Sequence, residues 1–477
     1  MAEQRIRAPE LADSLEWFNT SEPLRIAEQR GKVVLLDFWT YSCINCLHVV
    51  PDLRHLEEKY RDGLAVIGIH SPKFPHERVG AHLQKAINRH HIRHPVANDP
   101  KLQVWRQYGI KAWPSLIFID PQGYVLGVLR GEGRRKQLDG LIAQHLDQAE
   151  RAGILSTEQL PVRLQPEPRG TLSFPGKVLA HGNRVYISDS GHNRVMEATP
   201  DGQITRVFGT TSPGLLDGRE QEAAFRNPQG LTRVDDYLYV ADTGNHAVRR
   251  INLWDGEVQT VAGTGTQGRY AGDFYDDPLK APLNSPWDVA HHNGQLFIAM
   301  AGQHQVWALQ LTTNVVGNFA GSGREGIDDG AREKATLAQP SGLTVGDSRL
   351  YVADSETSAL RALDLPLGGV ETLVGTGLFD FGDADGIGAA ARLQHPLGVS
   401  YDGRRQCVWI ADTYNNKIKR MDVKSKQISS VDGCGDLAEP GGLSVAGDRL
   451  WIANTNAHEI RCLDLEQGGC TVLELHD

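Results

Sequence analysis

The sequence predicts two folding units in one chain, an α/β domain followed by an all-β propeller of six blades. The chain has 477 residues, which is too long for a single ordinary hydrophobic core. Residues 1–150 alternate strand-like with helix-like segments, whereas the residues after about 170 form short, repeating β runs punctuated by Gly, Asn and Asp. We therefore expect an α/β domain over 1–150, a linker rich in Pro and charge over 151–170, and a propeller over 171–477.

The first 150 residues give a regular series of elements. Residues 33–36 are apolar throughout and predict a buried strand, and the apolar residues between 44 and 60 recur at the spacing of a helix. Residues 64–69 predict a second strand. A helix over 76–91, a hairpin over 115–119 and 124–129, and a closing helix over 134–150 complete the expected order.

The second half contains six similar units. Each unit opens with a turn proline followed by an apolar run, and the spacing between units ranges from 44 to 58 residues. A period of this length with about four strands per unit is typical of propeller blades. One blade cannot bury both of its faces, so the six must pack radially around a channel. The opening prolines are Pro175, Pro228, Pro286, Pro340, Pro396 and Pro440.

Composition and charge argue against two classes of function, nucleic-acid binding and membrane anchoring. Hydrophobic residues make up 40% and charged residues 23%, which is typical of a soluble globular protein. The net charge is −10 and the excess of acid lies in the second half, so nucleic-acid binding is not expected, because phosphate contact needs a clustered basic surface. The charged N-terminus lacks an apolar export signal, and no stretch of 18 apolar residues follows. We expect a cytoplasmic protein without a membrane anchor, in which most of the six cysteines are reduced.

The motif Cys43-Ile44-Asn45-Cys46 lies where the first strand ends and the first helix begins. The N-terminus of a helix offers unpaired N–H groups and a partial positive charge, which favour a thiolate and lower the pKa of the first cysteine. We therefore expect Cys43 to be the nucleophile. Cys46 follows one helical turn later, where it can attack a mixed disulfide on Cys43 and release the reduced client.

Further residues accompany this motif: Asp37 stands six residues before Cys43, Pro51 five residues after Cys46, and Trp113-Pro114-Ser115 just before the hairpin. With them, residues 20–145 resemble the thioredoxin superfamily, especially its TlpA-like and DipZ-like branch. The resemblance implies a thioredoxin fold in which Asp37 is a buried proton acceptor for Cys46 and Pro114 is cis beside the sulfurs. The substrate groove that it implies is formed by Trp39, Asn45, Trp113 and Pro114.

The propeller units carry a second pattern, an Asp and a Ser or Thr followed by Asn, an aliphatic residue and a basic residue. It is visible at 189–194, 242–249 and 412–417, and it resembles NHL repeats. Unit three departs with Met300 and unit six with Asn454. The order of the two domains is similar to that of the NHL-repeat-containing protein 2 family, which implies a six-bladed NHL propeller.

The repeated aspartates have two readings. As in six-bladed lactonases, they could meet on the axis and hold a cation. Each is followed by Ser or Thr and a turn, however, which favours a carboxylate that accepts backbone N–H groups and fixes the turn. The longer loops that begin at Asp217, Asp329 and Asp385 should gather at one mouth of the propeller, and we expect a protein partner there. The repeated aspartates are Asp189, Asp242, Asp354 and Asp412.

Other readings of the cysteines and histidines remain open. A zinc half-site at Cys43 and Cys46 lacks a second ligand pair at finger spacing, so no metal and no cofactor are expected. Thr40 and Cys43 fit the T-x-x-C of peroxiredoxins, although Leu36 stands where that pattern has Pro. The cysteines of the propeller are expected to be buried thiols, and a disulfide between Cys462 and Cys470 is not expected. Three histidines, His90, His91 and His94, are expected at the surface around a helix end rather than on a metal.

We therefore expect a cytosolic thiol–disulfide oxidoreductase whose propeller binds a protein partner or disulfide client near Cys43. The alternative is a scaffold or redox sensor without catalysis, in which both domains bind a partner. A thiol peroxidase is a weaker third reading.

Overall fold

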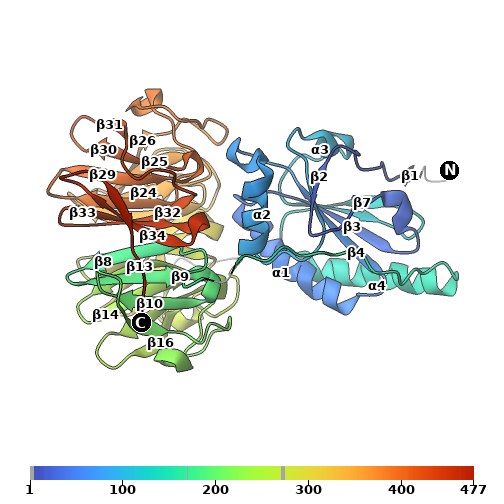
Figure 1. Ribbon diagram of the computed structural model, residues 1–477, viewed down its shortest axis with the longest axis horizontal. Coiled ribbons are helices and arrows are strands. Elements are labelled where there is room, and N and C mark those ends of the chain that lie inside the picture. The colour runs from blue at the N-terminus through green and yellow to red at the C-terminus, as the bar shows by residue number, and fades with distance from the viewer. Residues whose placement is uncertain (1–4, 169, 270–273) are drawn as a thin grey trace. The chain divides into compact units, whose positions relative to one another are not determined.

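The computed structural model describes residues 5–168, 170–269 and 274–477. The chain divides into two compact units, Met1–Pro168 and Arg169–Asp477, both drawn in Figure 1. No helix within the described ranges is long and apolar enough to cross a membrane.

The first unit is a seven-stranded sheet in the order β1-β7-β6-β3-β4-β5-β2. The central strands β3, β4 and β5 are parallel, whereas β6 and β7 form the antiparallel hairpin that the sequence predicts. The strands are β1 (Ile6–Arg7), β2 (Glu16–Phe18), β3 (Val33–Trp39), β4 (Leu64–His70), β5 (Val96–Asn98), β6 (Ser115–Ile119) and β7 (Tyr124–Arg130). The helices are α1 (Ile44–Lys59), α2 (Gly80–Arg89), α3 (Gln103–Gln107) and α4 (Arg135–Arg151), and a short 3-10 helix, η2, spans His76–Arg78.

Alternation along β3 explains how this sheet is covered. Val33 and Leu35 point to one face, where Leu53 of α1 and Ile142 of α4 pack on them. The intervening residues point to the other face, where residues of the N-terminal segment and α3 form a second apolar cluster. This arrangement confirms the predicted thioredoxin fold.

The residues predicted to be a linker pack on the first unit. The N–H of Ser156 donates to the carbonyl of Gly31 at 3.1 Å, and Val162 forms an isolated bridge with Thr20. Leu160 packs against the core of the first unit.

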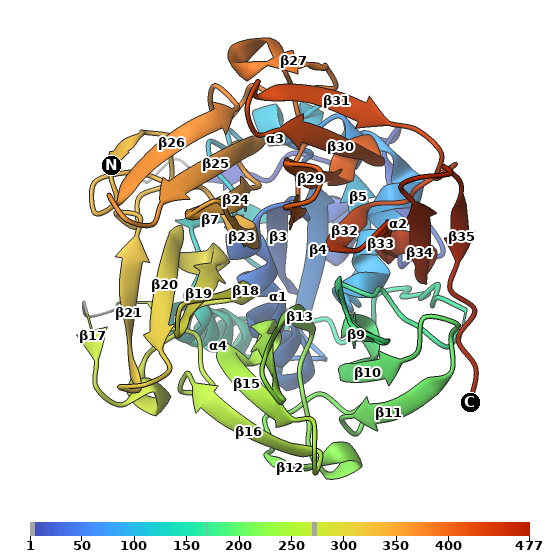
Figure 2. The ribbon, with the colours of Figure 1, turned by 90° about the vertical axis from the view of Figure 1, so that its left-hand side faces the viewer.

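The second unit is a ring of six antiparallel sheets, which confirms the six-bladed propeller (Figure 2). Blade one contains β8 (Lys177–His181), β9 (Arg184–Asp189), β10 (Arg194–Ala198) and β11 (Ile204–Phe208). Blade two contains β13 (Pro228–Val234), β14 (Tyr237–Asp242), β15 (Ala247–Asn252) and β16 (Glu257–Ala262). Blade three contains β18 (Pro286–His292), β19 (Gln295–Met300), β20 (Gln305–Gln310) and β21 (Val315–Ala320). Blade four contains β23 (Pro340–Gly346), β24 (Arg349–Asp354), β25 (Ala359–Asp364) and β26 (Gly369–Val374). Blade five contains β28 (Gly398–Asp402), β29 (Cys407–Asp412), β30 (Lys417–Asp422) and β31 (Gln427–Val431). Blade six contains β32 (Pro440–Ala446), β33 (Arg449–Asn454), β34 (Glu459–Asp464) and β35 (Cys470–Val472).

Blades two to five each gain a fifth strand that the sequence did not predict. A two-residue strand in the loop before the blade pairs with the outermost strand of that blade, and Figure 2 shows three of these strands, β12, β17 and β27, at the outer rim. Two-residue strands carry too few side chains for a recognisable alternation. They are β12 (Gly218–Arg219), β17 (Phe274–Tyr275), β22 (Gly330–Ala331) and β27 (Gly386–Ile387).

Polar side chains on the inner strands join neighbouring blades. Asp288 of blade three accepts the N–H of Leu343 of blade four at 3.0 Å, and Thr344 accepts the N–H of Tyr401 of blade five at 3.0 Å. The same pattern continues to the last seam, where Ser444 of blade six accepts the N–H of Ala180 of blade one at 2.9 Å.

The carboxyl-terminal segment also crosses the seam between blades six and one. His476 follows β35 and forms an isolated parallel bridge with Gln203, the residue before β11: its N–H donates to the carbonyl of Gly202 at 3.0 Å and its carbonyl accepts from the N–H of Ile204 at 2.7 Å. It therefore takes the outer place that the fifth strand fills in blades two to five.

A disulfide between Cys434 and Cys470 corrects the expectation that the propeller cysteines are thiols. Cys434 lies in the short loop before blade six, and Cys470 begins its outermost strand. The bond therefore joins loop to outer strand at the place where blades two to five have a fifth strand. Cys462 is free and lies opposite Thr471, so it does not face Cys470 directly.

Candidate active site

The two motif cysteines occupy different positions at the start of α1. Cys43 is the N-cap and is partly exposed, whereas Cys46 lies inside the first turn with 1% of its surface exposed. Both are free thiols, and the backbone N–H of Cys46 donates to Sγ of Cys43 at 3.4 Å. One sulfur is thus reachable from outside and the second lies behind it, as thiol–disulfide exchange requires.

The loop that leads to Cys43 is held by a buried carboxylate that sequence reasoning missed. Glu77 of η2 is 0% exposed and accepts the hydroxyl of Thr40 at 2.7 Å and the N–H of Ser42 at 3.0 Å. It also accepts the N–H groups of Lys73 and Phe74. Glu77 lies more than 30 residues from the motif, and no local pattern marks it.

The residues expected to form a substrate groove lie at different depths. The Trp113–Pro114 peptide bond is cis. Trp113 is half-buried, donates from Nε1 to the carbonyl of Ser71 at 2.9 Å, and packs on Trp105. Pro114 is buried and Asn45 is partly exposed. Trp39, by contrast, is 1% exposed and packs edge-on against His70, so its indole lies inside the domain.

Asp37 lies on β3 behind the motif and is buried. Burial raises the pKa of its carboxyl to about 7, while the nearby His94 opposes this rise. Burial also raises the pKa of the Cys46 thiol, and its hydrogen bond with Cys43 and the charge of Asp37 act in the same direction. A thiol of raised pKa beside a carboxylate that titrates near neutrality is an arrangement suited to proton transfer.

His94 corrects the expectation that the three histidines lie at the surface. His91 is exposed and His90 is the C-cap of α2, but the side chain of His94 is only 3% exposed. Its Nδ1 lies 3.4 Å from the carboxylate of Glu57, whose pull raises the pKa of His94 against the opposing effect of burial. Within the described ranges, no group of three or more His, Cys, Asp and Glu side chains is arranged to hold a metal.

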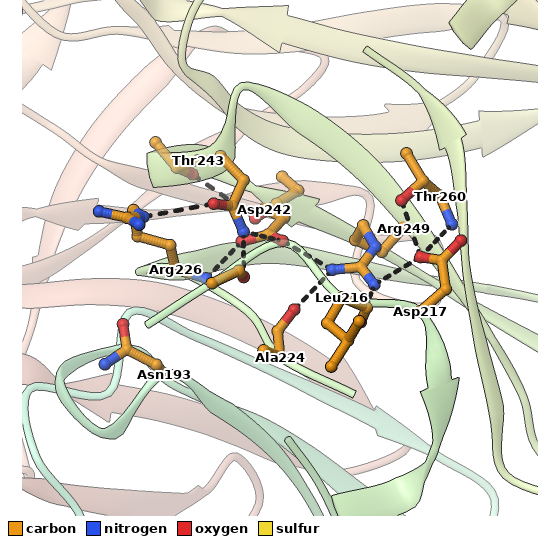
Figure 3. Close-up of polar contacts among 12 residues, drawn as sticks. Asn193, Leu216, Asp217, Ala224, Arg226, Asp242, Thr243, Arg249 and Thr260 are labelled. Atoms are coloured by element: carbon orange, nitrogen blue, oxygen red, sulfur yellow. Dashed lines mark hydrogen bonds and ion pairs between the residues drawn. The ribbon is translucent and has the colours of Figure 1, made fainter. Parts of the chain in front are cut away.

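The repeated aspartates of the propeller fix turns, as the second reading predicts. Asp242 accepts the N–H of Arg226 at 2.8 Å and pairs with Arg249 at 3.0 Å (Figure 3). Arg249 also reaches Asp217 at 2.8 Å, and Asp217 accepts from Thr260. The same network recurs around Arg361 in blade four and Lys419 in blade five, so the aspartates at the starts of the loops are bonded within their blades.

Blade three shows what replaces this network. Met300 stands at the position of Asp242, and Trp307, seven residues later, stands at the position of Arg249. Both side chains are 0% exposed, so two apolar groups fill the space of an ion pair. Blade three therefore keeps the strands of the other blades, although its buried side chains at these two positions are apolar.

Comparison with known proteins agrees with this architecture. A family of thioredoxin-like domains matches residues 31–125. NHL repeat-containing protein 2 of Bos taurus is 40% identical over 517 residues, which cover 97% of this chain and 71% of that protein. The chain belongs to the NHL repeat-containing protein 2 family. The resemblance seen in the sequence is thereby confirmed for both domains.

Two other relatives extend the comparison. Protein SUPPRESSOR OF QUENCHING 1, chloroplastic, of Arabidopsis thaliana is 42% identical over 499 residues, 96% of this chain and 47% of that protein. Thiol-disulfide oxidoreductase ResA of Bacillus anthracis is 26% identical over 120 residues, 25% of this chain and 66% of that protein. The thioredoxin-like domain of this NHL repeat-containing protein 2 family member thus has thiol–disulfide oxidoreductases among its relatives.

Proposed function

We propose that this chain is a cytoplasmic thiol–disulfide oxidoreductase that acts through Cys43 and Cys46, with its propeller as the module that binds a protein partner. The observation that carries the proposal is the pair of free thiols at the N-terminus of α1, one partly exposed and one buried behind it. The name of the Bacillus anthracis relative supports the same reaction class.

The proposed reaction conserves electrons and protons. The thiolate of Cys43 attacks a client disulfide, forming a mixed disulfide and releasing one client thiolate, which takes up a proton. Asp37 then accepts the proton of Cys46, and the resulting thiolate attacks Sγ of Cys43. The second client thiolate leaves and is protonated. The client gains two electrons, the protein holds a Cys43–Cys46 disulfide, and an external dithiol restores it.

The client contacts are proposed from the surface around Cys43. Asn45 and Trp113 are partly exposed and can contact a peptide, and Pro114, which follows Trp113 in the chain, is buried. We leave Trp39 out of this groove because its indole is buried. A second contact is proposed on the propeller loops before blades two, four and five. Their aspartates are bonded internally, but Leu216 and Ile387 remain exposed there.

Insulin reduction by dithiothreitol tests the proposal. The wild-type chain should accelerate insulin precipitation, and Cys43→Ser should abolish the acceleration. Equal rates for the two proteins would remove the support for turnover and favour the scaffold. Cys46→Ser should trap a client as a mixed disulfide on Cys43, which mass spectrometry identifies.

A further inference from the structure

A small region behind the two cysteines brings together groups that the proposed reaction does not yet use. Asp37, Gly68 and Val96 are register partners across β3, β4 and β5, so they point to the same face of the sheet. A Cβ placed on Gly68 would lie 3.1 Å from Nε1 of Trp39 and 3.4 Å from Nε2 of His94. The glycine therefore lets both ring nitrogens lie directly over the sheet, next to Asp37.

Three buried polar atoms in this region have no hydrogen-bond partner among the residues that the structure describes. They are Oδ1 of Asp37, Nε1 of Trp39 and Nε2 of His94. A buried polar atom left unpaired is destabilising, so folded proteins rarely keep three together without a reason. Their hydrogen-bonding capacities are complementary, because Trp39 donates, the carboxylate accepts and the imidazole can do either.

The opposite nitrogen of His94 faces an exit to solvent. Nδ1 lies 3.4 Å from Oε2 of Glu57 on α1, and the side chain of Glu57 is 26% exposed. Asn19 donates to the carbonyls of Ile92 and His94 and holds the segment before β5 in place. The charged groups that act on His94 are Glu57, Asp37 and Arg54. Cys46 is affected by the charge of Asp37, Asp37 is affected by that of His94, and His94 lies against Glu57, which reaches solvent.

We propose that His94 and Glu57 are positioning residues that pass the proton taken by Asp37 from Cys46 on to solvent, through one water held by Asp37, Trp39 and His94. The inference rests on the proposed function and deepens it. When Cys46 is deprotonated, its proton moves to Asp37 and then to Nε2 of His94 in its neutral form, whose Nδ1 proton moves to Glu57 and from there to bulk water. Asp37 returns to its carboxylate for the next cycle.

The electrostatics of the site agree with this route. The pKa of Asp37, raised to about 7 by burial, lets it accept and release a proton near neutral pH. The pull of Glu57 raises the pKa of His94 in spite of its burial, so the imidazole can hold the transferred proton.

A two-phase thiol reaction tests the proposal on the full chain. The reduced protein is mixed with one equivalent of 5,5′-dithiobis(2-nitrobenzoate), in a Cys462→Ser background because that thiol is partly exposed. Attack by Cys43 releases the first thionitrobenzoate, and attack by Cys46 on the mixed disulfide releases the second. The absorbance therefore reports the two steps separately, over a range of pH.

The variants are His94→Asn, which keeps a donor toward Glu57 but cannot carry a proton, and Glu57→Gln. The matched control is His91→Asn, at an exposed position of the same segment. We expect the first phase to be unchanged and the second to slow by roughly tenfold or more at pH 7 in both variants. In His94→Asn the midpoint of the second phase should also move to higher pH, because loss of the cation raises the pKa of Asp37.

The outcomes separate the two proposals. Normal second-phase rates and midpoints in both variants, equal to those of the control, would overturn the relay while leaving the oxidoreductase intact. A missing first phase in the wild type would overturn the proposed function itself. Thermal unfolding checks the folding of each variant, and if His94→Asn is unfolded, Glu57→Gln at its partly exposed position decides.

Discussion

Asp37 of the thioredoxin domain and Asp242 of the propeller are both fully buried, yet their surroundings differ. Burial raises the pKa of both, to about 7 for Asp37 and about 6 for Asp242. Asp242 is bonded by Arg249, by Asn245 and by the N–H of Arg226. Asp37 keeps one oxygen that no described residue bonds. Burial alone therefore does not mark a functional carboxylate, and our proposal for Asp37 rests on burial without saturation beside a thiol.

The largest effect is expected when the saturated network is broken. Asp242→Ala leaves the guanidinium of Arg249, which is 0% exposed, without its buried partner. We expect the free energy of unfolding of the propeller to fall by roughly 3–5 kcal/mol, measured by urea unfolding. Asp236→Ala, at an exposed ion pair of 4.0 Å, is the control and should change little. A loss below about 1 kcal/mol for Asp242→Ala would contradict the structural role.

Asp37→Asn should have the opposite effect on stability. The carboxyl titrates near 3.8 when unfolded and near 7 when folded, so the folded state binds more protons between these values and loses stability as the pH rises through them. At pH 8 the variant should gain roughly 2–4 kcal/mol in unfolding free energy, and at pH 4 almost nothing. Insulin reduction should fall by roughly 100-fold. Asp13→Asn, at an exposed position, is the control, and an unchanged pH dependence of Asp37→Asn would refute this account.

The two cysteine pairs differ in the same way: Cys43 and Cys46 are free thiols, whereas Cys434 and Cys470 are bonded to each other. The bond between Cys434 and Cys470 spans 36 residues, so Cys434→Ser should lower the unfolding free energy by about 3 kcal/mol under oxidising conditions. In dithiothreitol the difference should disappear. Cys462→Ser is the matched control within the same blade. Six reactive thiols in the denatured, unreduced protein, instead of four, would show that the bond does not form.

The smallest effect on stability is expected when the Asp242–Arg249 ion pair is replaced by apolar side chains of the kind that blade three has at these positions. Asp242→Met combined with Arg249→Leu substitutes apolar groups for both charges, as Met300 and Trp307 do. Buried ion pairs replaced by packed apolar residues are often neutral in stability. We expect the double variant to stay within roughly 1–2 kcal/mol of the wild type, well above either single variant. Additive losses in a double-mutant cycle would show that the two residues act independently.

Much of the candidate site could be predicted because its signals are local. Cys43, Cys46 and Asp37 lie within ten residues on a strand, a turn and a helix, and the resemblance to the thioredoxin superfamily implied the cis bond before Pro114. Glu77 and His94 could not be found in this way. Each reaches the site from another segment, and the burial of His94 depends on how the segment before β5 lies over Gly68.

Burial of Trp39 was missed for a related reason. A strand residue next to the motif points to one face or the other, but the sequence does not say how much of that face other segments cover. Nε1 of Trp39 and Nε2 of His94 lie over the same residue, Gly68, and His70 packs edge-on against the indole. The pairing of Cys434 with Cys470 was hidden too, because it brings a loop before the last blade to the final strand of that blade.

The amino-acid sequence was sufficient to predict both folds, the number of blades and the position of the two motif cysteines. It was sufficient because repeated apolar alternation must be buried and because a thiol at a helix start has a fixed local geometry. Only the tertiary structure decided which buried charges are satisfied. The physical reason is that the partners of a carboxylate come from distant segments: the same residue type is held by an arginine network at Asp242 and left poised to titrate at Asp37.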